Sequence, residues 1–294
     1  MTTIGNVLRH VRARLAAAGI ADPGLDARLI VEEGAKVSRE DALLRPERPI
    51  DPAAARRIET MAGRRVQGEP AHRILGWREF HGLRLKLSAA TLEPRPDTET
   101  LVDAVLPFVR ETADRLGACR ILDLGTGTGA VALALLAGEK RAAATGTDLW
   151  EEALATATEN ARALGLGDRF ATLHSNWFEG VSGRYHWIVT NPPYISENEM
   201  ATLPPEVERF DPVSALFGGP DGLAAYRAIA AGAGAFLEPD GGVAVEIGAA
   251  QKQAVEAVFA DKGFTVAAAA RDLGGRDRAL VFRPEAGRSK LSPS

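Results

Sequence analysis

The fold is decided by the stretch Ile121-Leu122-Asp123-Leu124-Gly125-Thr126-Gly127-Thr128-Gly129-Ala130. Its first four residues predict a buried strand, and the apolar run from Ala130 to Leu136 predicts a helix. The three glycines between them allow a tight turn and let a ligand approach the backbone closely. Because the start of a helix offers unpaired N–H groups and positive dipole, the stretch predicts a ligand-binding loop.

Strand and helix patterns alternate along the chain after this loop. Strands are expected at residues 143–147, 170–174, 187–190, 242–247, 264–268 and 279–282, and helices at 151–164, 223–237 and 251–262. Such alternation is typical of an α/β fold with a mostly parallel sheet, here of seven strands, and helices on both faces.

The N-terminal part follows a helical pattern without strands. Its apolar residues recur at helical spacing, and four short helices are predicted to form a small bundle. Ser38, with Asp41 three residues later, is typical of a helix start. The pair Asp51-Pro52 combines a capping carboxylate with proline at the first helical position, and predicts a helix to about Val66.

Glycine and proline residues between the predicted elements indicate the domain organisation. Alternation around Gly82 indicates a β-hairpin, and the segment Glu93-Pro94-Arg95-Pro96-Asp97-Thr98-Glu99 is extended by its prolines. This segment is either a stiff linker or a loop that folds over a cofactor, and Asp97 or Thr98 is expected to cap a helix that begins at Glu99. The expected parts are a helical domain at 1–73, a hairpin linker at 74–93, an α/β domain at 94–284 and a disordered tail at 285–294.

Composition excludes several classes of protein. Hydrophobic residues make up 46% of the 294 residues, which is ordinary for a globular protein. The net charge of −4 supplies no global basic field for a nucleic-acid backbone. Cys119 is the single cysteine, so an intramolecular disulfide and a cysteine metal cluster are excluded, and no metal site is expected. No apolar run reaches ~18 residues and no signal peptide is evident, so a cytoplasmic protein without a membrane segment is expected, as a monomer.

The glycine loop is followed by a carboxylate at the end of the next predicted strand. Asp148 in that position can accept both hydroxyls of a ribose, which predicts a nucleoside site, although the glycines could also serve helix packing alone. Gly125, Gly127 and Ala130 also satisfy the dinucleotide pattern. Asp123 favours a different ligand, because a carboxylate just before the loop suits a cation better than a pyrophosphate. S-adenosylmethionine, a sulfonium, is therefore preferred to a nicotinamide cofactor.

The tetrapeptide Asn191-Pro192-Pro193-Tyr194 follows the apolar run Trp187-Ile188-Val189-Thr190. Two prolines directly after a strand end its ladder and stiffen the backbone. The Asn191 side chain is then expected at the strand's carboxyl end, where open α/β sheets place their ligands. An amide beside a rigid turn and an aromatic ring can grip a planar –NH2 group, which suits methylation of a weakly nucleophilic nitrogen. The alternative is a proline-rich turn with a packed tyrosine.

Together these motifs resemble the HemK/PrmC group of protein-(glutamine-N5) methyltransferases. The resemblance rests on the glycine loop, Asp148, Asn176-Trp177-Phe178, the tetrapeptide and the Glu93–Glu99 segment, and it spans about residues 1–284. It implies a Rossmann-like methyltransferase domain, a helical domain that docks the substrate, and S-adenosylmethionine as cofactor. The implied substrate is the glutamine of the Gly-Gly-Gln motif in class 1 peptide chain release factors. Asn176 departs from the group's usual Asp, although its carbonyl can still accept a hydrogen bond.

The resemblance also implies roles for individual residues. Asn191 Oδ1 and the Pro192 carbonyl would each accept one N–H of the substrate amide, and Tyr194 would pack against the amide plane. The implied catalytic residues are Asn191, Pro192 and Tyr194, and the substrate-binding residues are Asn191, Pro192, Pro193 and Tyr194. The implied cofactor-binding residues are Asp123, Gly125, Thr126, Gly127, Thr128, Gly129, Asp148, Asn176, Trp177 and Asn191.

Three other functions remain open on the motifs alone. An adenine amine is also a planar –NH2 group, so an N6-adenine nucleic-acid methyltransferase shares the tetrapeptide pattern, although the acidic composition disfavours a direct nucleic-acid substrate. The methylated glutamine could belong to a ribosomal protein. The chain could also hold the cofactor as a non-catalytic sensor.

Overall fold

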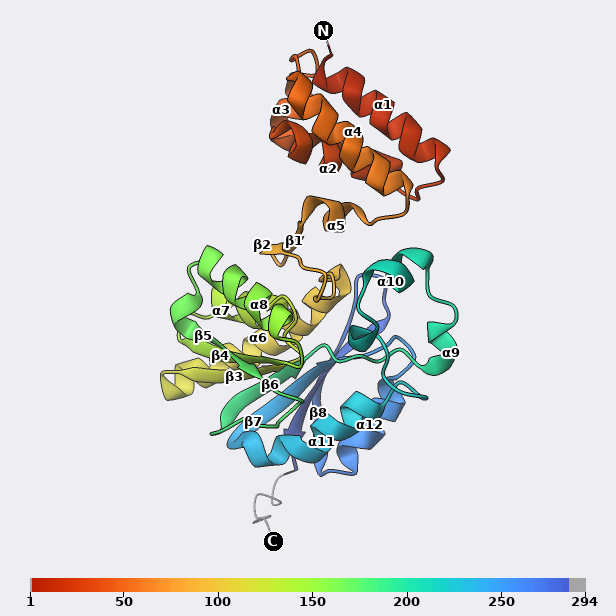
Figure 1. Ribbon diagram of the computed structural model, residues 1–294. Coiled ribbons are helices and arrows are strands. Elements are labelled where there is room, and N and C mark those ends of the chain that lie inside the picture. Colours follow the sequence, from red (N-terminus) through yellow and green to blue (C-terminus); the bar gives the residue numbers. More distant parts are fainter. Residues whose placement is uncertain (1, 286–294) are drawn as a thin grey trace. The chain divides into compact units, whose positions relative to one another are not determined.

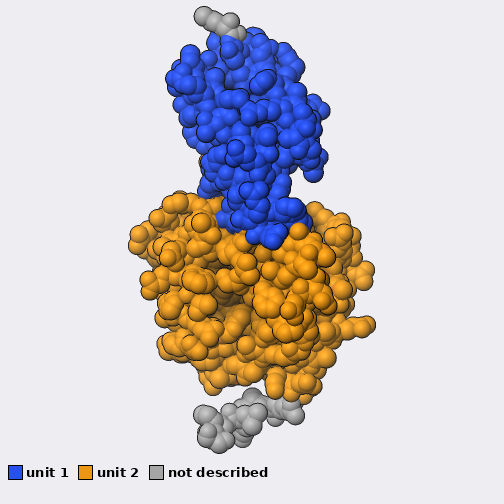
Figure 2. All heavy atoms as spheres, turned by 45° about the vertical axis from the view of Figure 1, so that its right-hand side comes forward, with its two compact units in different colours: residues 1–77, 204–210 blue, residues 78–203, 211–294 orange. Residues whose placement is uncertain are grey.

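The structure, a computed structural model, describes residues 2–285, which pack into two compact units (Figures 1 and 2). Unit 1 runs to Trp77 and also takes in Pro204–Phe210, whereas unit 2 holds Arg78–Leu203 and continues from Asp211. This packing differs from the expected domains, because 74–77 and 204–210 group with the helical part. The tail expected at 285–294 lies, apart from Glu285, outside the described residues.

Unit 1 is a helical bundle around an apolar core. Its helices are α1 (Ile4–Ala17), α2 (Pro23–Ala35), α3 (Arg39–Leu44), α4 (Pro52–Val66), α5 (Ala71–Leu75) and α10 (Pro205–Phe210). Two predicted caps are confirmed: the Ser38 hydroxyl accepts from the Asp41 N–H at 3.0 Å, and the Asp51 carboxylate accepts from the Ala54 N–H at 3.3 Å. The short helices α5 and α10 were not predicted.

A buried arginine holds α10 within unit 1. Arg65 is 6% exposed, and its guanidinium donates to Asp26 at 2.6 Å and to Glu206 at 2.8 Å. Both carboxylates raise the pKa of Arg65 against the effect of its burial. Glu206 therefore ties α10 to the other helices of unit 1.

Unit 2 contains the predicted seven-stranded, mostly parallel sheet, which is confirmed within the described residues. In space the order is β5-β4-β3-β6-β7-β9-β8, and all strands run parallel except β9, which is antiparallel to both of its neighbours, β7 and β8. The strands are β3 (Cys119–Leu124), β4 (Ala142–Asp148), β5 (Phe170–His174), β6 (Tyr185–Thr190), β7 (Leu237–Glu246), β8 (Phe264–Arg271) and β9 (Asp277–Pro284). Since the chain runs from β3 outward to β5 and then returns to β6 on the other side, the strand order reverses between β3 and β6. Ligands of open α/β sheets bind at the carboxyl ends beside such a point.

Helices cover both faces of this sheet (Figure 1). One apolar core joins the sheet to α6 (Pro96–Leu116), α7 (Ala130–Gly138) and α8 (Glu151–Ala163), and the other joins it to α11 (Ala224–Phe236) and α12 (Lys252–Ala260). The predicted hairpin forms from β1 (Trp77–Phe80) and β2 (Leu83–Lys86). Asn160 on α8 is 2% exposed and links this hairpin to the glycine loop, because its amide bonds Lys86 N, Lys86 O and Thr128 O.

The start of α6 corrects one prediction. The helix does not begin at Glu99 with Asp97 or Thr98 as its cap; Arg95 is the N-cap, and Pro96 is the first helical residue, without a capping side chain. Proline suits this position because its missing N–H would have no partner in the first turn. As a result, Thr98 lies inside the first turn and is free to make a contact elsewhere.

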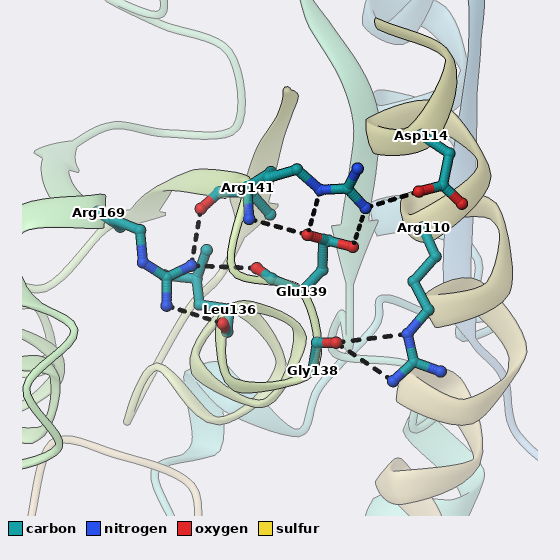
Figure 3. A network of polar contacts seen from close by, with 8 residues as sticks. Arg110, Asp114, Leu136, Gly138, Glu139, Arg141 and Arg169 are labelled. Atoms are coloured by element: carbon teal, nitrogen blue, oxygen red, sulfur yellow. Dashed lines mark hydrogen bonds and ion pairs between the residues drawn. The ribbon is translucent and has the colours of Figure 1, made fainter. Parts of the chain in front are cut away.

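Two arginines bond the carboxyl-terminal carbonyls of α7, and a third pairs with the Glu139 side chain (Figure 3). Arg110 on α6 donates to Gly138 O, and Arg169 donates to Leu136 O and Glu139 O. Arg141 pairs with Glu139 at 2.9 Å. Cations at this end of a helix also oppose the negative end of its dipole. The network fixes the far end of the helix whose first turn follows the glycine loop.

Candidate active site

A cavity of about 300 Å³ lies within unit 2 at the carboxyl ends of the central strands. Loops that follow β3, β4, β5 and β6 line it, together with the start of α6. The structure brings most of the sequence-predicted site residues to this cavity. They are Asp123, Gly125, Thr126, Gly127, Thr128, Asp148, Asn176, Trp177, Asn191 and Pro193.

Three predicted site residues do not line the cavity wall. Gly129 has φ 83° at the start of α7, and a Cβ there would lie 2.9 Å from Leu133, so this glycine serves the turn and the helix packing. Pro192 is buried, and Tyr194 packs in the apolar cluster shared with α11 and α12. Any part that Pro192 and Tyr194 take in binding a substrate goes through the shape of the corner they form with Asn191.

The glycine loop opens its backbone toward the cavity. Gly125 and Gly127 have φ values of 68° and 54°, and a Cβ added at either would meet no protein atom within 4 Å. Gly146 on β4 has a different reason, because a Cβ there would lie 2.8 Å from the Thr126 hydroxyl. The loop therefore packs closely on the neighbouring strand while leaving room on its other side for a ligand.

Asp123 is a buried carboxyl at the cavity wall, only 2% exposed. Its Oδ2 accepts from the Thr126 hydroxyl at 2.7 Å and from the Ala132 N–H at 3.3 Å. Burial raises the pKa of Asp123 to about 7, and the charge of Asp148 adds to the rise. A cation in the cavity would favour the ionised form of this carboxyl.

Asp148 ends β4 and lies against the loop. Its Oδ2 accepts from the Gly127 N–H at 2.9 Å, and its Oδ1 accepts from the Trp150 N–H at 3.1 Å. Burial raises the pKa of this carboxyl, although these N–H groups oppose the rise. Each carboxylate oxygen keeps further acceptor capacity, so Asp148 can still accept two hydroxyl groups from a ligand.

The residues after β5 form another wall of the cavity. Trp177 has φ 52°, in the left-handed region that costs a residue other than glycine about 1–3 kcal/mol. The Ser175 hydroxyl donates to Trp177 O at 3.0 Å, and the Asn176 amide donates to Glu179 at 3.3 Å. The chain therefore holds a large aromatic ring at the cavity in a conformation that its own backbone disfavours.

Asn191 presents a defined side of its amide to the cavity. Its Nδ2 donates to the Thr98 hydroxyl oxygen at 3.1 Å, which leaves Oδ1 as an acceptor for a bound group. Thr98 is 3% exposed and also lines the cavity. An acceptor on a residue that lines a cavity, beside a stiff corner, is the element that a planar –NH2 substrate needs.

The corner formed by Asn191 to Tyr194 is held in place by hydrogen bonds at the side-chain hydroxyl and at the backbone carbonyl of Tyr194. The Tyr194 hydroxyl donates to Glu246 Oε1 at 3.2 Å, and its carbonyl accepts from the Gln251 amide at 2.9 Å. Cβ atoms at Gly218 or Gly222 would lie 2.7 Å from Pro193 O or 2.3 Å from Tyr194 O. Only glycine leaves room for the corner to pack this closely.

Two side chains that line the cavity, Trp150 and Ser214, were not predicted from the sequence. Trp150 donates from Nε1 to the Ser214 hydroxyl at 3.2 Å, and both residues line the cavity. Ser214 lies in the short helix η2 (Val213–Ala215), whose sequence carries no signal for a ligand. Trp150 is 48% exposed. Its position two residues after Asp148, the residue predicted to bind the ribose, is a sequence signal that could have indicated it.

Within residues 2–285 no group of three or more histidine, cysteine, aspartate or glutamate side chains is arranged to hold a metal ion. Among the helices in that range, none combines the length and the apolar character needed to cross a membrane.

Known proteins are similar in sequence to this chain over most of its length. Residues 6–76 match the PrmC N-terminal domain, and residues 102–204 match the methyltransferase small domain. The release factor glutamine methyltransferase of Agrobacterium fabrum is 53% identical over 281 residues, which cover 96% of this chain and 97% of that protein. The protein of the same name from Cereibacter sphaeroides is 42% identical and covers 95% and 97%. The catalytic domain of hMettl16, solved with a hairpin of the MAT2A 3′UTR, shares the fold at a TM-score of 0.52, with 17% identity, 76% of this chain and 84% of that one.

Proposed function

Because the chain belongs to the family of release factor glutamine methyltransferases, we propose that it methylates the glutamine of the Gly-Gly-Gln motif in a class 1 release factor. The methyl group would pass from the sulfur of S-adenosylmethionine to the side-chain amide nitrogen, which leaves S-adenosylhomocysteine and releases one amide proton to solvent. The observation that carries the proposal is the Asn191 amide, whose Nδ2 is held by Thr98 and whose Oδ1 is left as an acceptor at the cavity.

The residues that line the cavity support S-adenosylmethionine as the cofactor. The open side of Gly125 and Gly127 leaves room for the ligand beside the loop, and Asp148 can accept the ribose hydroxyls. The buried Asp123 carboxyl suits the positive end of the cofactor. Trp177 supplies an aromatic wall for the adenine, with Asn176 beside it as an acceptor. When bound, S-adenosylmethionine supplies a methyl group activated by the positive charge on its sulfur.

Two acceptor groups of the corner would act on the nucleophile, the amide nitrogen of the substrate glutamine. An amide nitrogen is weakly nucleophilic because its lone pair is delocalised into the carbonyl. Asn191 Oδ1 would accept one N–H of the glutamine amide, the Pro192 carbonyl would accept the other, and both would raise the electron density on nitrogen. Orientation and electrostatics then account for most of the rate. The roles of Pro192 and Tyr194, and the expected cytoplasmic monomer, stay predictions.

Mass spectrometry of a purified release factor tests the proposal. Incubation with the enzyme and S-adenosylmethionine is expected to add one methyl group to the motif glutamine. A release factor with alanine in place of that glutamine is the matched control and is expected to gain nothing. Methyl transfer to a ribosomal protein or to DNA, with none to the release factor, would overturn the proposed substrate.

Binding of the cofactor is expected to release protons near neutral pH. With a pKa of about 7, Asp123 is about half protonated in the free protein at pH 7. A bound cation lowers this pKa, so the proton leaves as the complex forms, up to about half a proton for each cofactor bound. Titration calorimetry in buffers of different ionisation enthalpy measures the release.

Two comparisons show whether Asp123 is the source of that proton. Asp123→Asn has no proton to lose and is expected to bind with little proton release. S-adenosylhomocysteine lacks the sulfonium charge and is expected to release fewer protons than S-adenosylmethionine. Equal release by the wild-type protein and by Asp123→Asn would assign the proton to another group.

A further inference from the structure

A buried threonine determines which way the Asn191 amide faces. Thr98 Oγ1 accepts from Asn191 Nδ2 at 3.1 Å across 93 positions of sequence. An asparagine amide can turn by half a rotation with little change in shape, and it would then present its –NH2 to the cavity. A hydroxyl can also donate, so Thr98 alone would accept either orientation. Something must engage the Thr98 hydroxyl hydrogen for Oδ1 to remain directed at the substrate.

Glu246 offers a buried acceptor that could engage that hydrogen. It ends β7, is 2% exposed, and its Oε1 accepts from the Tyr194 hydroxyl at 3.2 Å. Within the described residues its Oε2 is buried and makes no hydrogen bond, so this oxygen is an acceptor that needs a donor. The Thr98 hydroxyl is close enough to this carboxyl to lower its pKa. The Glu246 carboxyl therefore contacts Tyr194 at one end of the corner and neighbours Thr98, which bonds Asn191 at the other end.

We propose that Thr98 and Glu246 are positioning residues, which act through Asn191 and Tyr194 to direct an amide oxygen at the substrate nitrogen. The ionised Glu246 accepts the Thr98 hydrogen, so Thr98 Oγ1 can only accept from Asn191 Nδ2. Asn191 Oδ1 is then turned toward the substrate amide, which presents N–H groups. The inference rests on the proposed function and adds to it the two residues that determine the polarity of the site.

The charge of Glu246 depends on every group that faces it. Burial raises its pKa to about 7, while Thr98, Arg278 on β9 and the Tyr194 hydroxyl lower it, and Asp97 on α6 raises it. Tyr226 on α11 donates its hydroxyl to the Glu246 backbone carbonyl at 2.9 Å. Since the ionised carboxyl gives the productive orientation, kcat is expected to rise with pH through about 7 and to fall as the carboxyl is protonated below it.

The first experiment changes the hydroxyl of Thr98. Thr98→Val keeps the shape and removes the acceptor, and it is expected to lower kcat by about 10²-fold at unchanged affinity for S-adenosylmethionine. Thr98→Ser restores the hydroxyl and is expected to recover most of kcat. Thr112→Val is the matched control, because Thr112 lies on the same helix, is 4% exposed and accepts from Trp187 Nε1 at 3.1 Å away from the cavity. It is expected to lose thermal stability but not kcat.

The second experiment replaces one acceptor oxygen of the Glu246 carboxylate with a hydrogen-bond donor. In Glu246→Gln the amide oxygen can still accept from Tyr194, but the new –NH2 donates to Thr98 and turns its hydroxyl toward Asn191 Oδ1. The expected loss of kcat is similar to that of Thr98→Val, and the rise of kcat with pH near 7 is expected to disappear. The double variant Thr98→Val/Glu246→Gln is expected to have a kcat no lower than that of either single variant. The pH profile is measured at saturating S-adenosylmethionine, because the bound cation keeps Asp123 ionised. The titration of Asp123 then does not contribute to the change of kcat with pH.

The outcomes separate this inference from the proposed function. A wild-type enzyme that leaves the release factor unmodified would refute the function itself. An active wild type with unchanged kcat in Thr98→Val, or an unchanged pH profile in Glu246→Gln, would refute the positioning role alone. Equal losses in Thr98→Ser and Thr98→Val would also refute it, because they would mark a packing effect that the hydroxyl does not relieve.

Discussion

Asn191→Ala is expected to lower kcat by about 10²–10³-fold, the effect typical of losing one preorganised hydrogen-bonding group that stabilises a transition state. The substitution removes the amide oxygen proposed to accept from the substrate, and the Thr98 hydroxyl no longer accepts a hydrogen bond from Asn191 Nδ2. The affinity for S-adenosylmethionine is expected to change by less than about threefold, because the Asn191 acceptor acts on the substrate amide. Single-turnover rates and calorimetric titration measure the two quantities separately.

Asn176→Ala is the matched control for that result. Asn176 lines the same cavity but follows β5, on the side where Trp177 lies. Its loss is expected to weaken cofactor binding more than it lowers kcat, the reverse of the pattern for Asn191→Ala. Small and equal losses of kcat and of cofactor affinity in Asn191→Ala would contradict the role given to the corner.

Asp148→Ala is expected to weaken binding of S-adenosylmethionine by about 10²-fold or more. Hydrogen bonds to a charged group contribute about 1.5–3 kcal/mol each, and the ribose would offer two of them. The alanine also leaves the N–H groups of Gly127 and Trp150 without their acceptor, so the loop is expected to lose order in the free protein. The dissociation constant from calorimetric titration measures the loss, and kcat at saturating cofactor is expected to fall less.

Two other substitutions define the cause of the weaker binding. Asp148→Asn keeps one acceptor oxygen and is expected to give an intermediate affinity. Asp168→Ala removes the same charge from the exposed turn η1 (Gly167–Arg169) before β5, at the opposite edge of the sheet from the cavity. It is expected to leave affinity unchanged, so a comparable loss there would indicate a general charge effect. Unchanged affinity in Asp148→Ala would remove Asp148 from the cofactor site.

The sequence by itself determined the sheet, the glycine loop and the corner. Each depends on neighbours along the chain: an apolar run predicts a buried strand, glycines permit a left-handed turn, and two prolines end a ladder. The expected strands at 121–124 and 187–190 lie side by side in the sheet, so the loop after one and the corner after the other meet at the same edge. Local patterns were sufficient there because parallel strands bring their carboxyl ends together.

Only the tertiary structure decided which side chains control the corner. Thr98 was expected to cap a helix, yet it lies in the first turn of α6 and accepts from Asn191, and Glu246 had no assigned role until it was found behind Tyr194. Ser214 likewise reaches the cavity from a segment without a recognisable motif. A hydrogen bond between residues 93 positions apart leaves no mark on the residues around either partner, since the packing of the sheet and its helices brings the two together. Most of the residues that meet at the cavity could therefore be predicted from local sequence, whereas the orientation of the Asn191 amide depends on the packed interior.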